Sequence, residues 1–166
     1  MGTFSKSFAS AGEYIASDKK TLSLLRNNSY SYVYWNALPP VAAQQIISCL
    51  EIINSPEGER KIAQLRKNSI SLRTKLIDAG CHVLWDIESP VILVMIYHLA
   101  KIKDISRLCL KNGVTIVVVG FPACSIEDCR IRICISAGHT DADIERGFKV
   151  TIDDLRQTDC IFQNAF

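Results

Sequence analysis

Hydrophobic positions recur at helical spacing through the first half of the chain. Residues 17–28, 39–54 and 56–79 each carry apolar side chains at intervals close to 3.6 residues. Proline suits the first turn of a helix, and Gly80 stands where helices commonly end. The pattern therefore predicts three consecutive helices before residue 80.

Beyond residue 80 the apolar runs become shorter and are typical of strands. The runs 82–85 and 91–97 read as strands, and 114–119 is a wholly apolar strand of the buried kind. Residues 130–136 alternate strictly. This alternation places Ile131, Ile133 and Ile135 on one face and Arg130 and Arg132 on the other.

Two more helices accompany these strands. One is marked by apolar residues within 102–109 and is ended by Asn112 and Gly113. The other begins at Thr140, whose spacing to Asp143 resembles a capping box. The order of elements predicts an α/β sandwich with a small sheet.

Composition places the chain among globular proteins. It has 166 residues, of which 48% are hydrophobic and 22% are charged, so it is long and apolar enough to bury a core. Nineteen basic and seventeen acidic side chains leave a charge of +2 without a basic stripe, which argues against a nucleic-acid partner. The apolar runs are far shorter than the roughly 20 residues that span a bilayer, so we expect no membrane span. No apolar region follows Met1, so we expect no secretory signal either.

Seven cysteines form no C-x-x-C pair, and their number is odd. This favours free thiols in a reducing compartment over a disulfide framework. The even spacing of Cys124, Cys129 and Cys134 raises the question of a metal site. Zinc sites favour closer pairs, and Cys134 lies in a strand, so we expect buried thiols and no metal.

One lysine, Lys6, stands among hydroxyl and aromatic residues near the start of the chain. Phe4 and Phe8 could desolvate its amine, which would lower the pKa and make the amine nucleophilic toward an aldehyde cofactor. Thr3 and its hydroxyl neighbours could hold that cofactor's phosphate. A P-loop is excluded because Ser5 stands where its glycine is required. On composition alone, a solvated surface lysine remains the simpler interpretation.

Residues 1–16 resemble the cofactor-attachment segment of the α-oxoamine synthases, a family of pyridoxal-phosphate enzymes. Within that family they are most similar to the catalytic subunits of eukaryotic serine palmitoyltransferase. The similarity continues, in the family's order, through residues 37–47, 88–97, 117–123 and 130–140. It covers nearly the whole chain except its last dozen residues.

The resemblance implies the C-terminal portion of a fold-type-I pyridoxal-phosphate transferase, an α/β fold. Residues 1–55 would be the tail of the cofactor-binding large domain with a connecting helix. Residues 56–166 would be the small C-terminal α/β domain. The opening segment 2–12 has no element ahead of it, so we expect that a preceding part is missing.

The same resemblance implies an acyltransferase that condenses L-serine with a fatty acyl-CoA, the first step of sphingolipid synthesis. Lys6 would bind pyridoxal 5'-phosphate covalently and act as the acid and base, and Thr3 would contact the phosphate. Arg132 would hold the substrate carboxylate, which suits the planar guanidinium fork. The family further implies a heterodimer with a related subunit on the cytosolic face of the endoplasmic reticulum.

Two alternatives remain open at this point. One is another α-oxoamine synthase that uses glycine, and the other is a non-catalytic truncated paralogue that acts through subunit association. Glu13 and Ala9 stand where the family has glycines, and the acidic side chain would repel a phosphate. Because the family's earlier domain is absent, we expect the isolated chain to bind pyridoxal phosphate poorly and to make no ketosphinganine. We also expect segment 1–12 to lack hydrogen-bond partners and to fray.

Overall fold

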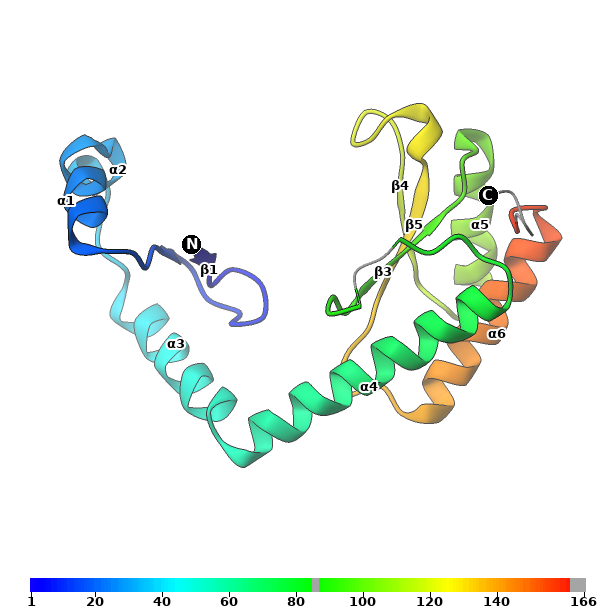
Figure 1. Cartoon of the computed structure of the whole chain (residues 1–166), viewed down its shortest axis with the longest axis horizontal. Coiled ribbons are helices and arrows are strands. Elements are labelled where there is room, and N and C mark those ends of the chain that lie inside the picture. Colours follow the sequence, from blue (N-terminus) through cyan, green and yellow to red (C-terminus); the bar gives the residue numbers. More distant parts are fainter. Residues whose placement is uncertain (85–86, 162–166) are drawn as a thin grey trace. The chain divides into compact units, whose positions relative to one another are not determined.

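The computed structural model describes residues 1–84 and 87–161, which form two compact units, Met1–Glu59 and Arg60–Phe166 (Figure 1). The end of the predicted strand 82–85 therefore lies outside the described residues. The first unit contains β1 (Gly2–Thr3), β2 (Glu13–Tyr14), α1 (Lys19–Asn28), α2 (Tyr30–Tyr34) and α3 (Pro40–Ile53). Helix α4 (Pro56–Asp78) begins in this unit and continues into the second. The assignment of residues 1–55 and 56–166 to a large and a small domain stays a prediction.

The helices of the first unit begin where side chains can cap them. Asp18 accepts a hydrogen bond from the Thr21 backbone N–H at 2.9 Å, so α1 begins one residue later, at Lys19. Ser29 caps the short helix α2 in the same way, an element that the hydrophobic pattern does not predict. Helix α3 has Pro40 as its first residue, as expected.

The second unit combines the rest of α4 with three more helices and a sheet. These elements are β3 (Val91–Met95), α5 (Leu99–Lys111), β4 (Val117–Val119), a short 3₁₀ helix (Ile126–Asp128), β5 (Arg130–Cys134) and α6 (Asp141–Gln157). Thr140 and Asp143 form the capping box that the sequence predicts at the start of α6.

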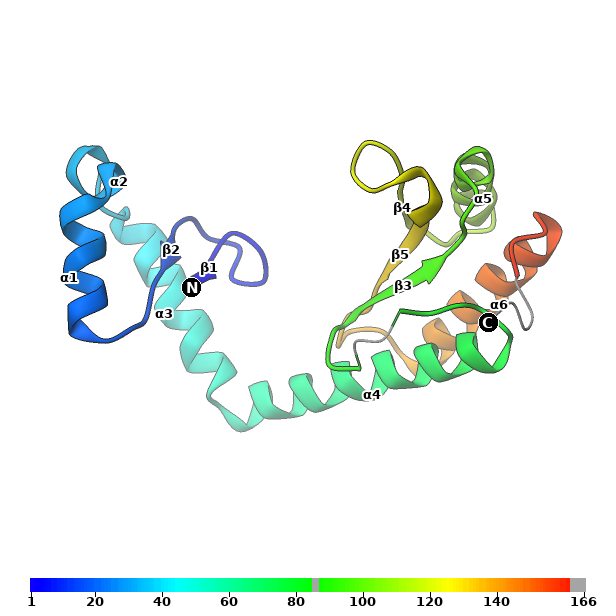
Figure 2. The same cartoon turned by 45° about the horizontal axis from the view of Figure 1, so that its top comes forward.

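The sheet is antiparallel, and its strand order is β3-β5-β4, so β5 is the central strand. Ile131 lies opposite Val94 and Ile133 opposite Ile92, and all four side chains are buried. They form one core with apolar residues of α4, α5 and α6, the helices that Figure 2 shows beside the sheet. The predicted apolar face of residues 131–135 is thus the face that the helices cover.

The predicted strands 91–97, 114–119 and 130–136 are shorter in the structure, and the described part of 82–85 is not a full strand. Val83 forms only an isolated bridge with Val94. The strand predicted from residue 114 begins at Val117, because the Val114 N–H donates to the Cys109 carbonyl at 2.8 Å and closes the end of α5. Gly113 makes this closure possible with a φ of 81°, in the region that favours glycine.

Polar side chains on the buried face of α4 hold the two segments that flank the sheet. The Asn68 amide donates to the carbonyls of Ser136, at 3.1 Å, and His139, at 2.8 Å. The buried Arg73 guanidinium donates to the Leu84 carbonyl at 2.7 Å. These bonds tie backbone carbonyls to α4, and so they hold the turn after β5 and the segment before β3.

The cysteines are predicted to differ strongly in reactivity. Burial raises the pKa of Cys81 to about 11 and that of Cys109 to about 12, whereas Cys134 is exposed. Because the thiolate is the reactive form, only about one part in a thousand of Cys81 is reactive at pH 8. Alkylation at that pH, followed by peptide mapping, should therefore label Cys134 well before Cys81 or Cys109. Equal labelling of all three in the folded chain would contradict this burial.

Candidate active site

Lys6 lies in a tight loop that connects β1 and β2. The Phe4 N–H donates to the Gly12 carbonyl at 2.9 Å, and the Ala9 N–H donates to the Lys6 carbonyl at 2.9 Å. Ala9 has a φ of 47°, a left-handed conformation that glycine adopts more easily. The expectation that segment 1–12 lacks partners is therefore wrong, because β1, β2 and the loop bond to one another.

The aromatic side chains of the loop pack on one another and not around the lysine. The Phe4 and Phe8 rings meet edge to face at 5.1 Å, and Phe4 also lies 5.2 Å from the Tyr14 ring. Lys6 itself is exposed. The expected desolvation of its amine by Phe4 and Phe8 is thus wrong for this chain.

Helix α3 holds the loop in place. The Ser10 hydroxyl donates to the Ala42 carbonyl at 3.0 Å, and the Gln45 amide donates to the Phe8 carbonyl at 3.3 Å. These contacts leave the side-chain polar groups of Thr3, Ser5, Lys6 and Ser7 exposed and without partners in the described part of the chain. An amine and three hydroxyls on one loop are a donor set that fits a group carrying an aldehyde and a phosphate.

Glu13 lies directly across this pair of strands from Thr3. Neighbouring residues of an antiparallel pair have Cα atoms about 5 Å apart and project to the same side. A carboxylate is therefore placed beside the hydroxyl that would contact a phosphate, and the two negative charges would repel each other.

Arg132 belongs to the second unit and lies at the middle of the central strand. Leu93 of β3 and Val117 of β4 flank it in register, on the face opposite the helix-covered core. Its side chain is exposed, and none of the described residues pairs with it. A fixed backbone and a free guanidinium fork are what the recognition of a carboxylate requires.

Arg130 lies on the same face, two residues earlier, between Met95 and Val119. Its side chain is half-buried, and its Nε atom is buried without a hydrogen-bond partner among the described residues. The alternation of residues 130–136 already places it beside Arg132, but the sequence analysis gives it no role.

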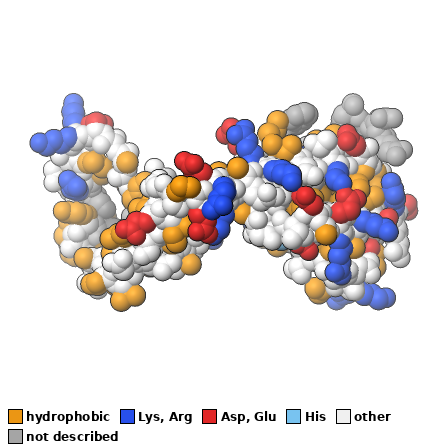
Figure 3. Space-filling model, turned by 90° about the horizontal axis from the view of Figure 1, so that it is seen from below, with side chains coloured by type: hydrophobic (Ala, Val, Ile, Leu, Met, Phe, Trp, Pro, Cys, Tyr) orange, Lys and Arg blue, Asp and Glu red, His pale blue; other side chains and the backbone are white. Residues whose placement is uncertain are grey.

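Other surface features add little to these two sites. Within residues 1–84 and 87–161, no group of three or more His, Cys, Asp or Glu side chains could hold a metal ion, and none of the helices there is long and apolar enough to cross a membrane. Figure 3 shows basic and acidic side chains interspersed on the face that it draws.

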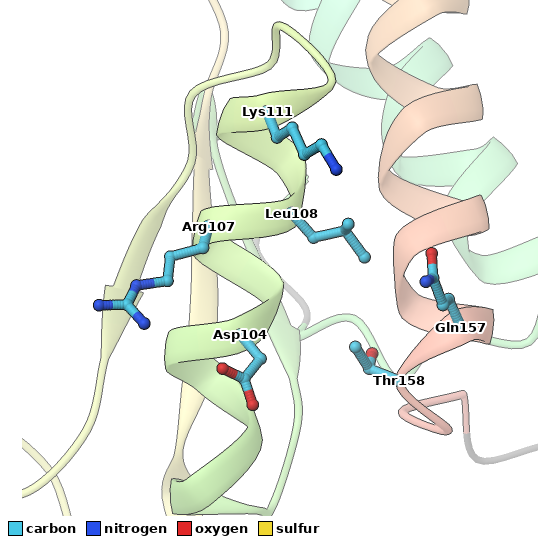
Figure 4. Close-up of a pocket in the computed structure, with 6 residues that line it drawn as sticks. All are labelled: Asp104, Arg107, Leu108, Lys111, Gln157 and Thr158. Carbon is cyan, nitrogen blue, oxygen red and sulfur yellow. The ribbon is translucent and has the colours of Figure 1, made fainter.

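A shallow groove between α5 and α6 contains none of the predicted site residues (Figure 4). Its lining is formed by Asp104, Arg107, Leu108, Lys111, Gln157 and Thr158.

Comparisons with known proteins agree with the resemblance. The family model for aminotransferase class I and II matches residues 1–150. The chain is 44% identical over 154 residues to long chain base biosynthesis protein 2a of Arabidopsis thaliana, covering 90% of this chain and 32% of that protein. It is 42% identical over 149 residues to serine palmitoyltransferase 2 of Dictyostelium discoideum, covering 87% and 30%.

Solved structures resemble the fold closely. A serine palmitoyltransferase of Sphingomonas wittichii superposes with a TM-score of 0.82 and 26% identity, over 97% of this chain and 40% of that one. A structure of SPT with a PLP internal aldimine gives a TM-score of 0.86 at 22% identity, over 96% and 40%. The predicted fold class, the C-terminal portion of a fold-type-I transferase, is confirmed.

The chain spans about a third of the length of the curated relatives that it matches. The match to the family model nevertheless extends over nearly all of it, including the Lys6 loop and the strand that carries Arg132. The chain belongs to the aminotransferase class I and II family.

Proposed function

We propose that this chain is the C-terminal part of a serine palmitoyltransferase catalytic subunit, which condenses L-serine with a fatty acyl-CoA. The observation that carries the proposal is the identity of 44% over 90% of the chain to a long chain base biosynthesis protein. The exposed Lys6 loop and the unpaired Arg132 support it, because they supply an amine for a cofactor and a guanidinium for a substrate carboxylate.

Pyridoxal phosphate is the cofactor that we propose for the Lys6 loop. When bound, it supplies a carbonyl for amines and an electron-withdrawing ring. Lys6 would hold it covalently through Nζ and would later take up and return a proton at that nitrogen. The Thr3 hydroxyl would donate a hydrogen bond to its phosphate.

Arg132 would bind and orient the amino acid. Its fork can donate two parallel N–H bonds to the carboxylate, which fixes the direction of the substrate as well as its position. Leu93 and Val117 flank Arg132 on the neighbouring strands, so the backbone that carries the guanidinium is fixed on both sides.

The proposal also includes a subcellular location and a partner subunit, and both rest on the family resemblance. We expect the complete protein to pair with a related subunit and to act at the cytosolic face of the endoplasmic reticulum. The names of the relatives support the enzyme class, and the second subunit is the natural candidate for covering the exposed aromatic side chains of α2.

One observation favours a second candidate, the non-catalytic paralogue. Glu13 lies opposite Thr3, where a carboxylate opposes a phosphate. If this repulsion decides the outcome, replacing Glu13 by glycine should increase the affinity for pyridoxal phosphate severalfold, and the parent chain should bind it only weakly even in a complete protein.

The carboxylate role can be tested in a chimaera in which the part of the Arabidopsis relative that this chain lacks is joined to this chain. In that protein, Arg132→Ala should weaken serine binding by about 1.5–3 kcal/mol, the usual strength of a charged hydrogen bond, or roughly tenfold to a hundredfold. Spectroscopic titration with serine measures the change, and cofactor binding should persist. The exposed Arg107 of α5, changed to alanine, is the matched control. Equal serine affinity in Arg132→Ala and the parent would rule the role out.

A further inference from the structure

The face of β5 opposite the helix-covered core carries two cations, and none of the described residues forms an ion pair with either of them. Arg130 and Arg132 alternate with the buried Ile131 and Ile133, so their side chains project to the same side of β5. Residues two positions apart along an antiparallel strand, such as these, are separated by about 7 Å. Asp128, the nearest carboxylate along the chain, instead accepts a hydrogen bond from the Ser125 hydroxyl at 2.6 Å.

Arg130 is the more unusual of the two arginines. It is half-buried, its Nε atom is shielded from water, and nothing in the described chain accepts a hydrogen bond from that atom. Its neighbour across β3 is Met95, which is only 4% exposed. The two terminal nitrogens of its guanidinium also have no described partner, but they are not among the atoms shielded from water, so they can donate to a ligand that brings an acceptor.

We propose that Arg130 and Arg132 together form a site for short dicarboxylates, the class that includes acidic amino acids. Arg132 holds one carboxylate, as in the proposed function on which this inference rests, and Arg130 holds the second. Arg130 is then a specificity-determining residue. Because of it, an amino acid with an anionic side chain can compete with a neutral amino acid for binding at Arg132.

The geometry of the strand supports a two-point contact. β5 is hydrogen-bonded on both sides, so the backbone under both arginines is fixed. The separation of about 7 Å along the strand is within reach of two long side chains that converge on one small ligand. A dianion would also relieve the repulsion between the two guanidinium groups.

A matched pair of probes distinguishes a ligand held by one arginine from a ligand held by both. Butyrate and succinate both have four carbons, but butyrate has one carboxylate and succinate has two. The complete 166-residue chain is titrated with each at constant ionic strength, because salt screens such contacts, and the guanidinium Nε–H resonances are followed. We expect succinate to bind about tenfold more tightly than butyrate.

Four variants distinguish the possible outcomes. Arg130→Gln should reduce the succinate preference to about twofold or less, while Arg130→Lys, which keeps the charge, should retain part of it. Arg107→Gln should leave it intact. A preference near one in the parent, or one that survives in Arg130→Gln, would overturn the inference. The proposed function fails separately, if Arg132→Gln binds butyrate as well as the parent does.

Discussion

Replacing Lys6 by alanine is expected to abolish both cofactor attachment and ketosphinganine synthesis in the chimaera. The reason is chemical, because alanine has no amine to hold the cofactor and none to move the substrate proton. The Lys6 side chain also lacks a partner among the described residues, so its loss should leave the surrounding fold intact. The measurements are the visible absorbance of the lysine-bound cofactor and an assay with radiolabelled serine and palmitoyl-CoA.

The control for this change is Lys20→Ala, which removes another exposed lysine from the same unit. It should keep the absorbance and the turnover of the parent chimaera. An unchanged spectrum in Lys6→Ala would remove this lysine from the proposed role, whatever the activity. If the parent chimaera itself binds no cofactor while its Glu13→Gly variant does, the repulsion opposite Thr3 is the cause.

Leu76→Ala is expected to lower the free energy of unfolding of the chain by about 3 kcal/mol. Leu76 is fully buried at 0% exposure, where α4 packs against the sheet and α6. Truncating such a side chain loses its transfer free energy and leaves a cavity, and measured losses for this change span about 2.7–5 kcal/mol. Urea denaturation followed by circular dichroism gives the value.

The next residue along the same helix provides the comparison. Ile77 is 41% exposed, so Ile77→Ala removes little buried area and should shift the unfolding free energy by less than about 1 kcal/mol. Similar losses in the two variants would show that this face of α4 does not pack on the core.

Most helices of the fold can be predicted from the sequence because their signals are local. Spacing places α3, α4 and α5 nearly at their observed bounds, and the Thr140 capping box fixes the start of α6. Helix α2 escapes prediction because it is short, aromatic and carries no buried residue, so no hydrophobic period marks it. In the described part of the strand predicted at 82–85, Val83 forms only an isolated bridge, since an apolar run does not reveal how much of a neighbouring strand is available to pair with it.

The candidate sites likewise have some features that the sequence predicts and others that depend on tertiary contacts. Alternation along residues 130–136 correctly separates the arginines from the buried isoleucines. The surroundings of Lys6 could not be predicted, because the packing of Phe4 on Phe8 and Tyr14 depends on the pairing of β1 with β2, two strands of two residues each. Glu13 could be recognised as unusual from the sequence, but only the register shows that it faces Thr3.

The order of the strands also has a consequence for how the protein is made. Among the three described strands of the sheet, β3 and β4 each pair with β5, which is the last of the three to leave the ribosome. Outside these strands, β3 has the isolated bridge from Val94 to Val83. Until residues 130–134 are available, the two earlier strands have exposed edges and no partner within the sheet, and such edges promote aggregation. A nascent chain or a fragment that stops short of Arg130 should therefore depend on chaperones, whereas one that extends past Cys134 can close its sheet by itself.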